Sequence, residues 1–222
     1  TSIEPVSAKS LMAQIDSILS DFHIDAIKIG MVYNSQIIKT INSKLRNIRV
    51  PIVVDPIIKS TTGAILLKKS ALRDYKKMMV PLADVITPNK FEAKALSGIS
   101  NTKKSAKKIQ SMGAKCVIIT GTTLSNGKIS DFVLEESKEY VISGKKIPIK
   151  NHGSGCNYSA SIAVSLAKGN TMYNAVKTAK DYVYQSIRNS KKIGKGVSIT
   201  HKNISNGMRE LSDSINHFKQ IK

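Results

Sequence analysis

The chain has 222 residues, of which 41% are apolar, and a formal net charge of +20 from 35 basic and 15 acidic residues. This length and apolar content exclude a disordered tail and predict one globular domain with a single core. No apolar run approaches the roughly 20 residues of a membrane-spanning helix, and the first residues lack the pattern of a secretory leader. We therefore expect a cytoplasmic protein without a membrane partner.

The excess of lysine raises the question of nucleic-acid binding. The basic residues are scattered over predicted helix surfaces, as at Lys103, Lys104, Lys107 and Lys108, without an arginine-rich block or an aromatic-interleaved strand. The four histidines also lack metal-ligand spacing. We expect no nucleic-acid partner and no zinc, although a basic surface also attracts a polyanion such as ATP.

The apolar pattern predicts alternating helices and short strands from the start of the chain. A helix capped by Ser7 carries Ile15, Ile18, Leu19 and Phe22, and a helix capped by Ser35 carries Ile37 to Leu45. Strands are predicted over residues 24–29, 51–54 and 85–86, and helices over 70–79, 91–96 and 103–112.

The second half begins with a predicted strand over residues 116–120, which ends at Gly121. Residues 132–134 and 140–142 predict an antiparallel hairpin at a sheet edge. Helices are predicted over residues 158–167 and 171–188, and residues 208–221 have a weak helical pattern typical of a tail or linker.

This alternation predicts an α/β fold with a mainly parallel sheet and helices on both faces. Ligands in such folds bind at the carboxyl ends of the strands. Four polar segments are predicted there: Asp55-Pro56, Thr87-Pro88-Asn89 with Glu92, Thr120-Gly121-Thr122, and His152-Gly153-Ser154-Gly155-Cys156.

The glycine turn at Gly153 and Gly155 is the most informative of these segments. Glycines let successive backbone N–H groups point into one cavity, and the following helix adds its unpaired N–H groups and its dipole. This combination favours an anion, such as a transferring phosphoryl group. The same field predicts a lowered pKa for the Cys156 thiol and a role as proton acceptor. A plain loop-to-helix turn with a buried cysteine is the alternative.

Two other glycine patterns are near-misses. Residues 121–128 resemble a P-loop but have one residue too many between the glycines, and Ile129 stands where Ser or Thr is required. Gly153-Ser154-Gly155 begins like a dinucleotide-binding fingerprint, but Tyr158 replaces the third glycine. We reject both.

Asn89 and Glu92 lie three residues apart at a predicted helix start. Together they suit a magnesium-bound water near phosphates, because hydrated Mg²⁺ meets only one or two carboxylates. A helix cap explains the same pair, and Asp55 before Pro56 is also compatible with a simple strand terminus. Cys116 in its apolar run is predicted to be a buried strand residue, and a disulfide with Cys156 is not expected in a reducing compartment.

Taken in order, these segments resemble the hydroxymethylpyrimidine/phosphomethylpyrimidine kinases of thiamine biosynthesis, within the ribokinase-like superfamily. The resemblance rests on residues 26–31, 53–56, 85–89 with Glu92-Ala93, and 151–156, and on residues 179–183 and 194–196 near the end. It implies a ribokinase-like three-layer α/β/α domain over residues 1–200, followed by a tail or linker helix over 201–222.

The resemblance implies ATP and Mg²⁺ as cofactors and a pyrimidine as substrate, in a homo-oligomer such as a dimer. Cys156 would be the base, and Gly153, Ser154 and Gly155 would form the anion hole. Asn89 and Glu92 would belong to the motif that binds magnesium and phosphate. Asp55, Asn89, Thr120, Gly121 and Thr122 would lie near ATP, and Gly30 and Met31 near the pyrimidine.

Several positions depart from the family pattern. The usual first strand, glycine-rich segment and pyrimidine-reading Gln precede the point at which this chain starts, so we expect an N-terminally incomplete domain. Ser154 replaces the commoner Thr, and Thr120 stands where Lys is frequent. Three alternatives stay open. A pyridoxal or pyridoxine kinase of the same superfamily is a close variant, and the missing N-terminal segment motivates a non-catalytic pyrimidine or nucleotide sensor on this fold. The net charge of +20 motivates a basic nucleic-acid-binding protein.

Overall fold

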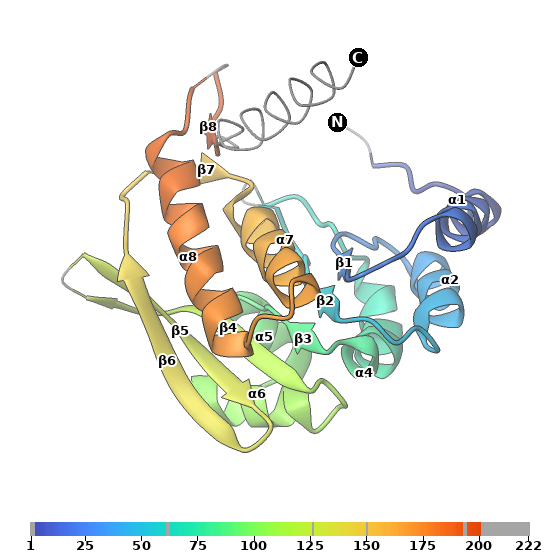
Figure 1. The fold of residues 1–222 in the computed structure, drawn as a ribbon, viewed down its shortest axis with the longest axis horizontal. Coiled ribbons are helices and arrows are strands. Elements are labelled where there is room, and N and C mark those ends of the chain that lie inside the picture. The colour runs from blue at the N-terminus through green and yellow to red at the C-terminus, as the bar shows by residue number, and fades with distance from the viewer. Residues whose placement is uncertain (1–2, 61–62, 126, 150, 193–194, 201–222) are drawn as a thin grey trace, which may run out of the picture.

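The computed structural model describes residues 3–60, 63–125, 127–149, 151–192 and 195–200. Its centre is a six-stranded sheet in the order β1-β2-β3-β4-β5-β6 (Figure 1). The first four strands are parallel, and the last two form an antiparallel hairpin at one edge. The strands are β1 Ile27–Ile29, β2 Ile52–Val54, β3 Val85–Ile86, β4 Cys116–Ser125, β5 Lys128–Glu135 and β6 Lys138–Lys145.

Helices connect and cover these strands. They are α1 Ala8–Asp21, α2 Ser35–Leu45, η1 Lys69–Ala71, α3 Leu72–Asp74, η2 Tyr75–Met79, α4 Val80–Leu82, α5 Lys90–Ser97, α6 Thr102–Gln110, α7 Ser154–Ala167 and α8 Met172–Arg188. A separate parallel pair, β7 Asn151–His152 and β8 Ser198–Ile199, lies beside the start of α7 (Figure 1). Among the described residues, no helix is long and apolar enough to cross a membrane.

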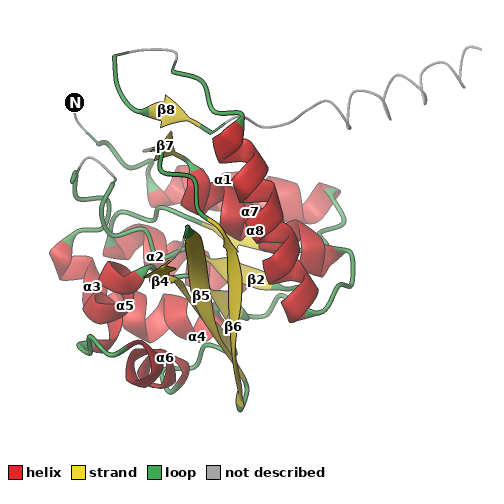
Figure 2. Cartoon of the chain, turned by 90° about the vertical axis from the view of Figure 1, so that its left-hand side faces the viewer, coloured by secondary structure: helices red, strands yellow, loops and turns green. Residues whose placement is uncertain are grey.

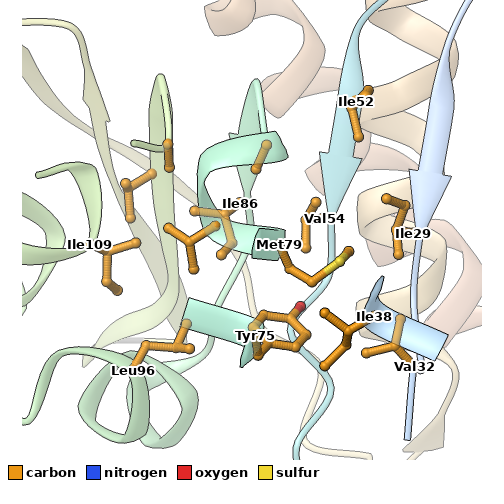
Figure 3. Packing of buried hydrophobic residues seen from close by; sticks show 14 of the residues in the cluster. Ile29, Val32, Ile38, Ile52, Val54, Tyr75, Met79, Ile86, Leu96 and Ile109 are labelled. Atoms are coloured by element: carbon orange, nitrogen blue, oxygen red, sulfur yellow. The ribbon is translucent and has the colours of Figure 1, made fainter. Parts of the chain in front are cut away.

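Two apolar clusters hold the helices on opposite faces of the sheet. Neighbouring strand residues point to opposite faces, so Val54 joins one cluster and Val53 the other. The first cluster contains side chains of α2, η2, α5 and α6, and Figure 3 shows Tyr75, Met79 and Leu96 beneath the strands. The second contains side chains of α7 and α8. Figure 2 shows the resulting helix, sheet and helix layers, which confirm the predicted α/β/α architecture.

The parallel strands end at one edge of the sheet, as predicted. Gly30 follows β1, Asp55 follows β2 and Thr87 follows β3. The Thr120 amide donates to the Pro88 carbonyl at 2.9 Å, which places β4 in the same row. The fold therefore gathers three of the four predicted polar segments, which are far apart in the sequence, at the edge where Gly30 also lies.

The structure corrects two predicted elements in the first half of the chain. Asn34, rather than Ser35, caps α2, because its side chain accepts from the Ile37 amide at 3.0 Å. The predicted helix over 70–79 is a 3₁₀ turn, a short α-helical turn and the π-helical turn η2. Pro81 follows in α4, and a proline lacks the N–H that a regular helix needs. The tail prediction for residues 208–221 lies outside the described residues.

The predicted end of β4 at Gly121 is also wrong. The strand continues to Ser125 through a register shift between Ile119 and Thr123. Gly121 has φ +65, a conformation that a glycine adopts without a steric penalty. Gly121 therefore marks a bulge, where the strand turns aside without ending.

Candidate active site

A compact polar cluster lies where β1 and β2 end and α7 begins. Asp55 is 6% exposed, and its Oδ2 lies 3.7 Å from Lys28 Nζ and accepts a hydrogen bond of 3.1 Å from Ser159 Oγ. The Cys156 thiol also forms a hydrogen bond with the Asp55 side chain. One buried carboxylate thus joins a cation, a hydroxyl and the predicted catalytic thiol.

Helix α7 begins without a side-chain cap. The five other helices of eight or more residues, α1, α2, α5, α6 and α8, each have a capping Ser, Asn or Thr whose side chain accepts from a backbone N–H. The N-cap of α7 is Gly153, at φ +93, and no side chain caps the helix. The first N–H groups of a helix have no intrahelical acceptor, so those of Ser154, Gly155 and Cys156 remain for an anion.

This geometry corrects two predictions about the turn. The helix begins at Ser154, four residues before the predicted start. Gly153 alone adopts a positive φ, because Gly155 already lies within the first helical turn. A Cβ at Gly155 would meet nothing within 4 Å, so this glycine leaves open space above the helix end.

Thr200 fastens the turn from the other side. Its Oγ1 donates to the His152 carbonyl at 3.1 Å and accepts from Asn157 Nδ2 at 3.0 Å. A Cβ built on Gly153 would lie 2.9 Å from Thr200 Oγ1. Position 153 therefore requires a glycine for two reasons: its φ is positive, and an added Cβ would come too close to Thr200.

The electrostatic prediction for Cys156 is wrong. Its side chain is exposed at the start of α7, as the predicted role requires. However, partial burial raises the pKa of the thiol, and Asp55 raises it further through its charge and its hydrogen bond. Lys28 opposes this shift without reversing it. The helix end alone predicted a lowered pKa of the thiol, whereas partial burial, with the charge of Asp55 added to it, raises this pKa.

Asn89 and Glu92 form a complete capping box at the start of α5. Asn89 Oδ1 accepts from the Glu92 amide at 3.0 Å, and Glu92 Oε2 accepts from the Asn89 amide at 2.9 Å. The Glu92 carboxylate also accepts from the backbone of Ile58. Each of these oxygens keeps a second acceptor lone pair, so the cap and a contact to a metal-bound water are compatible.

The pKa of Glu92 is raised to about 7, mainly by burial and also by the charge of Asp55, while backbone hydrogen bonds oppose the shift. Its folded pKa thus lies above its unfolded value, so the native protein binds more protons between these two values. We expect the free energy of unfolding to fall as pH rises from about 4.5 to 7, with up to about 3 kcal/mol from this group. Urea unfolding in metal-free buffer from pH 5 to 8 measures this effect.

Glu92→Gln should flatten that dependence, because Gln retains an acceptor for the cap but does not ionise. Glu139→Gln is the matched control: Lys103 and Lys107 lower the pKa of Glu139, so it is already ionised across this range. Parallel curves for wild type and Glu92→Gln would contradict the assignment.

The predicted nucleotide-binding turn adjoins the capping box. Thr120 pairs with Asn89 in an isolated parallel bridge. The Gly121 amide donates to Asp131 Oδ1 at 3.0 Å, and Thr122 Oγ1 donates to the Ser130 carbonyl at 3.0 Å. The structure therefore places Thr120 beside Asn89. Gly121 and Thr122 are held by hydrogen bonds to residues of the neighbouring strand β5.

Gly30 and Met31 lie on the first-strand side of the site. A Cβ at Gly30 would approach Lys28 Nζ to 2.7 Å, so glycine leaves room for the ammonium group beside Asp55. The Met31 side chain is 43% exposed. These positions are compatible with the predicted substrate contacts.

Sequence reasoning missed four residues at the site: Lys28, Ser159, Thr200 and Tyr75. A lysine between apolar residues in a predicted strand was a usable signal for Lys28. Tyr75 is 1% exposed, and its hydroxyl has no hydrogen-bond partner among the described residues. Burial, and secondarily Asp55 and Glu92, raise the pKa of this phenol well above its usual value. Only the fold brings these residues near Asp55 and Gly153.

The site can hold an oxyanion at α7 and a proton acceptor beside it. Both cysteines are free, with Cys116 buried in β4. Within the described part of the chain, no group of three or more His, Cys, Asp or Glu side chains could bind a metal directly. The arrangement suits phosphoryl transfer, which depends mainly on positioning and electrostatic stabilisation.

Residues 1–201 match the family model described as phosphomethylpyrimidine kinase. The chain belongs to this family. It is therefore a kinase, that is, a phosphotransferase. A hydroxymethylpyrimidine/phosphomethylpyrimidine kinase of Haemophilus influenzae is 36% identical over 205 residues, which cover 87% of this chain and 76% of that protein.

Solved structures of kinases have the same fold. The pyridoxal kinase from Staphylococcus aureus in complex with AMP-PCP and pyridoxal superimposes with a TM-score of 0.79 and 31% identity, covering 90% of this chain and 75% of that one. The phosphomethylpyrimidine kinase from Clostridium difficile gives a TM-score of 0.71 and 30% identity, covering 84% and 79%. The ribokinase-like fold of this family member is thus confirmed.

Proposed function

We propose that this protein transfers phosphate from ATP to hydroxymethylpyrimidine and then to its monophosphate, in thiamine biosynthesis. The observation that carries the proposal is the uncapped start of α7, where Gly153 leaves three amides free beside the exposed Cys156. Family membership supports this chemistry, because the Haemophilus influenzae relative is named for both pyrimidine substrates.

In the first proposed transfer, the substrate hydroxyl oxygen forms a bond to the γ-phosphorus of ATP; in the second, an oxygen of the monophosphate forms this bond. The bond from that phosphorus to the β,γ-bridging oxygen breaks, and ADP leaves. The amides of Ser154, Gly155 and Cys156 bind the oxygens of the transferring group, where negative charge is spread in the transition state. The hydroxyl proton passes to the sulfur of Cys156.

The raised thiol pKa gives Asp55 a part in this proton transfer. At neutral pH the thiol form of Cys156 predominates, so its own proton must leave as the substrate proton arrives. The Asp55 carboxylate is hydrogen-bonded to the thiol, and burial raises the pKa of Asp55. A carboxylate with a raised pKa accepts a proton more readily. We therefore assign Asp55 as the acceptor of the thiol proton, with Lys28 and Ser159 orienting it.

Mg²⁺ fits the residues on the other side of Asp55. Two buried carboxyl groups with raised pKa values, Asp55 and Glu92, lie in an environment that favours added positive charge. Glu92 and Asn89 would hold the ion through a coordinated water, since Mg²⁺ usually retains several waters. When bound, the ion neutralises charge on the phosphates of ATP.

ATP would then lie along Asn89 and the turn from Thr120 to Thr122. The Asn89–Thr120 bridge and the bulge at Gly121 form one continuous edge next to Asp55. The pyrimidine would occupy the side lined by Gly30 and Met31, with its hydroxymethyl group toward Cys156. The AMP-PCP complex of the Staphylococcus aureus kinase supports a nucleotide site in this fold.

A pyridoxal kinase is the second candidate, because the structure also superimposes on the Staphylococcus aureus pyridoxal kinase. Steady-state kinetics with hydroxymethylpyrimidine, its monophosphate and pyridoxal, coupled to ADP formation, separate the two functions. We expect kcat/KM for both pyrimidines to exceed that for pyridoxal by at least about tenfold, a difference of about 1.4 kcal/mol in transition-state binding.

The opposite order of kcat/KM would assign the chain to pyridoxal phosphorylation. Calorimetric binding of pyrimidine and AMP-PCP without ADP formation from any substrate would instead support a non-catalytic sensor. A preparation of the Haemophilus influenzae relative, assayed in parallel, controls for the coupling system.

A further inference from the structure

A buried ion pair lies outside the residues that the proposed reaction uses. Lys180 Nζ on α8 lies 2.8 Å from Asp131 Oδ2 on β5, and the two side chains are 8% and 4% exposed. Burying two charges costs several kcal/mol of desolvation, which apolar residues of similar size would avoid. A pair in this position therefore suggests a role other than stability.

Both oxygens of Asp131 contact segments of the site. Oδ1 accepts from the Gly121 amide at 3.0 Å, in the bulge where φ is +65. Oδ2 accepts from the Tyr158 hydroxyl at 2.8 Å, two residues beyond Cys156 in α7. One carboxylate thus connects the proposed nucleotide turn on β4 with the helix that carries the anion-binding amides.

Gly144 leaves space for the Lys180 side chain. A Cβ on Gly144 of β6 would lie 3.1 Å from Lys180 Cε, so a larger residue there would require the lysine side chain to shift. Lys180 supplies the charge that keeps Asp131 paired without competing for Oδ1. The Gly121 amide consequently has one oxygen to itself, and its direction is fixed.

We propose that Asp131 is a positioning residue for nucleotide binding and phosphoryl transfer. It fixes the Gly121 bulge and the start of α7 relative to each other, and Lys180 neutralises it. The expected effect on phosphoryl transfer rests on the proposed function. The expected effect on nucleotide binding does not, and it can be measured by itself. The effect passes through the Gly121 hydrogen bond, because that is the contact between Asp131 and the nucleotide turn.

Two charge-neutral double variants test the proposal. Asp131→Asn with Lys180→Met removes both charges but leaves a side-chain oxygen for Gly121. Asp131→Ala with Lys180→Met removes the charges and that acceptor. Urea unfolding identifies conditions in which both variants are folded. Calorimetry with AMP-PCP gives the dissociation constant, and hydrogen exchange of the peptide spanning Gly121 reports the bond itself.

We expect the Asn variant to bind AMP-PCP within about twofold of wild type and the Ala variant about tenfold more weakly, a typical effect of one positioning hydrogen bond. Exchange at Gly121 should be fast only in the Ala variant. Lys103→Met with Glu139→Ala removes a partly exposed ion pair and serves as the matched control with unchanged affinity.

Equal AMP-PCP affinity in both folded double variants would overturn the proposal, as would absence of AMP-PCP binding by the wild type. Failure of the proposed function has a different signature. In that case the wild type and the Asn variant bind AMP-PCP, the Ala variant binds it weakly, and ADP is not formed with a pyrimidine.

Discussion

Replacement of Cys156 by Ala should lower kcat by about 10²- to 10⁴-fold, the usual contribution of a positioned general base. The dissociation constant for AMP-PCP should change less than about twofold, because the anion-binding groups at α7 are backbone amides. The exposed sulfur and its hydrogen bond to Asp55 are the structural basis of this expectation. Steady-state kinetics with hydroxymethylpyrimidine, together with calorimetry, measure both quantities.

Cys116→Ala is the matched control, since this other cysteine lies buried in β4 away from the site. It should keep kcat, with some loss of stability from the core. The rate of iodoacetamide alkylation against pH then gives the pKa of Cys156 directly. Asp55→Asn should lower that pKa, because it removes a neighbouring negative charge. Full activity of Cys156→Ala would refute the base assignment.

Replacement of Gly153 by Ala should impair folding and phosphate binding together. The backbone has φ +93, which costs an L-residue about 1–2 kcal/mol, and the added methyl group would lie 2.9 Å from Thr200 Oγ1. Displacement of the turn misdirects the first amides of α7, so kcat/KM should fall about 100-fold, as when a donor to a transition-state oxyanion is lost. Urea unfolding and steady-state kinetics measure the two effects.

Variants at two other glycines distinguish the effect of backbone strain from the loss of anion binding. Gly98→Ala places the same strain at φ +77, at the end of α5, where nothing lies within 4 Å. It should lose stability but keep kcat/KM. Gly155→Ala adds a methyl group in a helical position with open space, so it should keep stability while weakening AMP-PCP binding. If Gly153→Ala and Gly155→Ala both had wild-type kinetics, the assignment of the turn as an anion-binding site would be wrong.

The layers of the fold could be predicted from the sequence because the apolar pattern indicates which face of each element is buried. Short apolar runs predicted β1 to β3, and apolar residues at helical spacing predicted α1 and α2. The polar segments after the strands followed from the rule that parallel strands end at one edge. Asp55, Asn89 and Thr120 do lie in that row, as predicted.

Features that depend on backbone geometry were predicted less well. The bulge at Gly121 and the π-helical turn at Tyr75–Met79 arise where a strand or helix departs from its ideal period. Periodicity cannot show such departures. The start of α7 at Ser154 was missed for a related reason, because Ser154, Gly155 and Cys156 add no apolar stripe to the helix.

The sequence by itself determined the α/β class, the family and the segments that form the site, because these follow from local patterns along the chain. The tertiary structure alone decided how charges interact within it. Lys28, Asp55, Glu92 and Cys156 are separated by tens of residues. The pKa shifts of Asp55, Glu92 and Cys156 depend on distance and burial, which only the packed fold defines. The same holds for Asp131, whose partners come from three different elements.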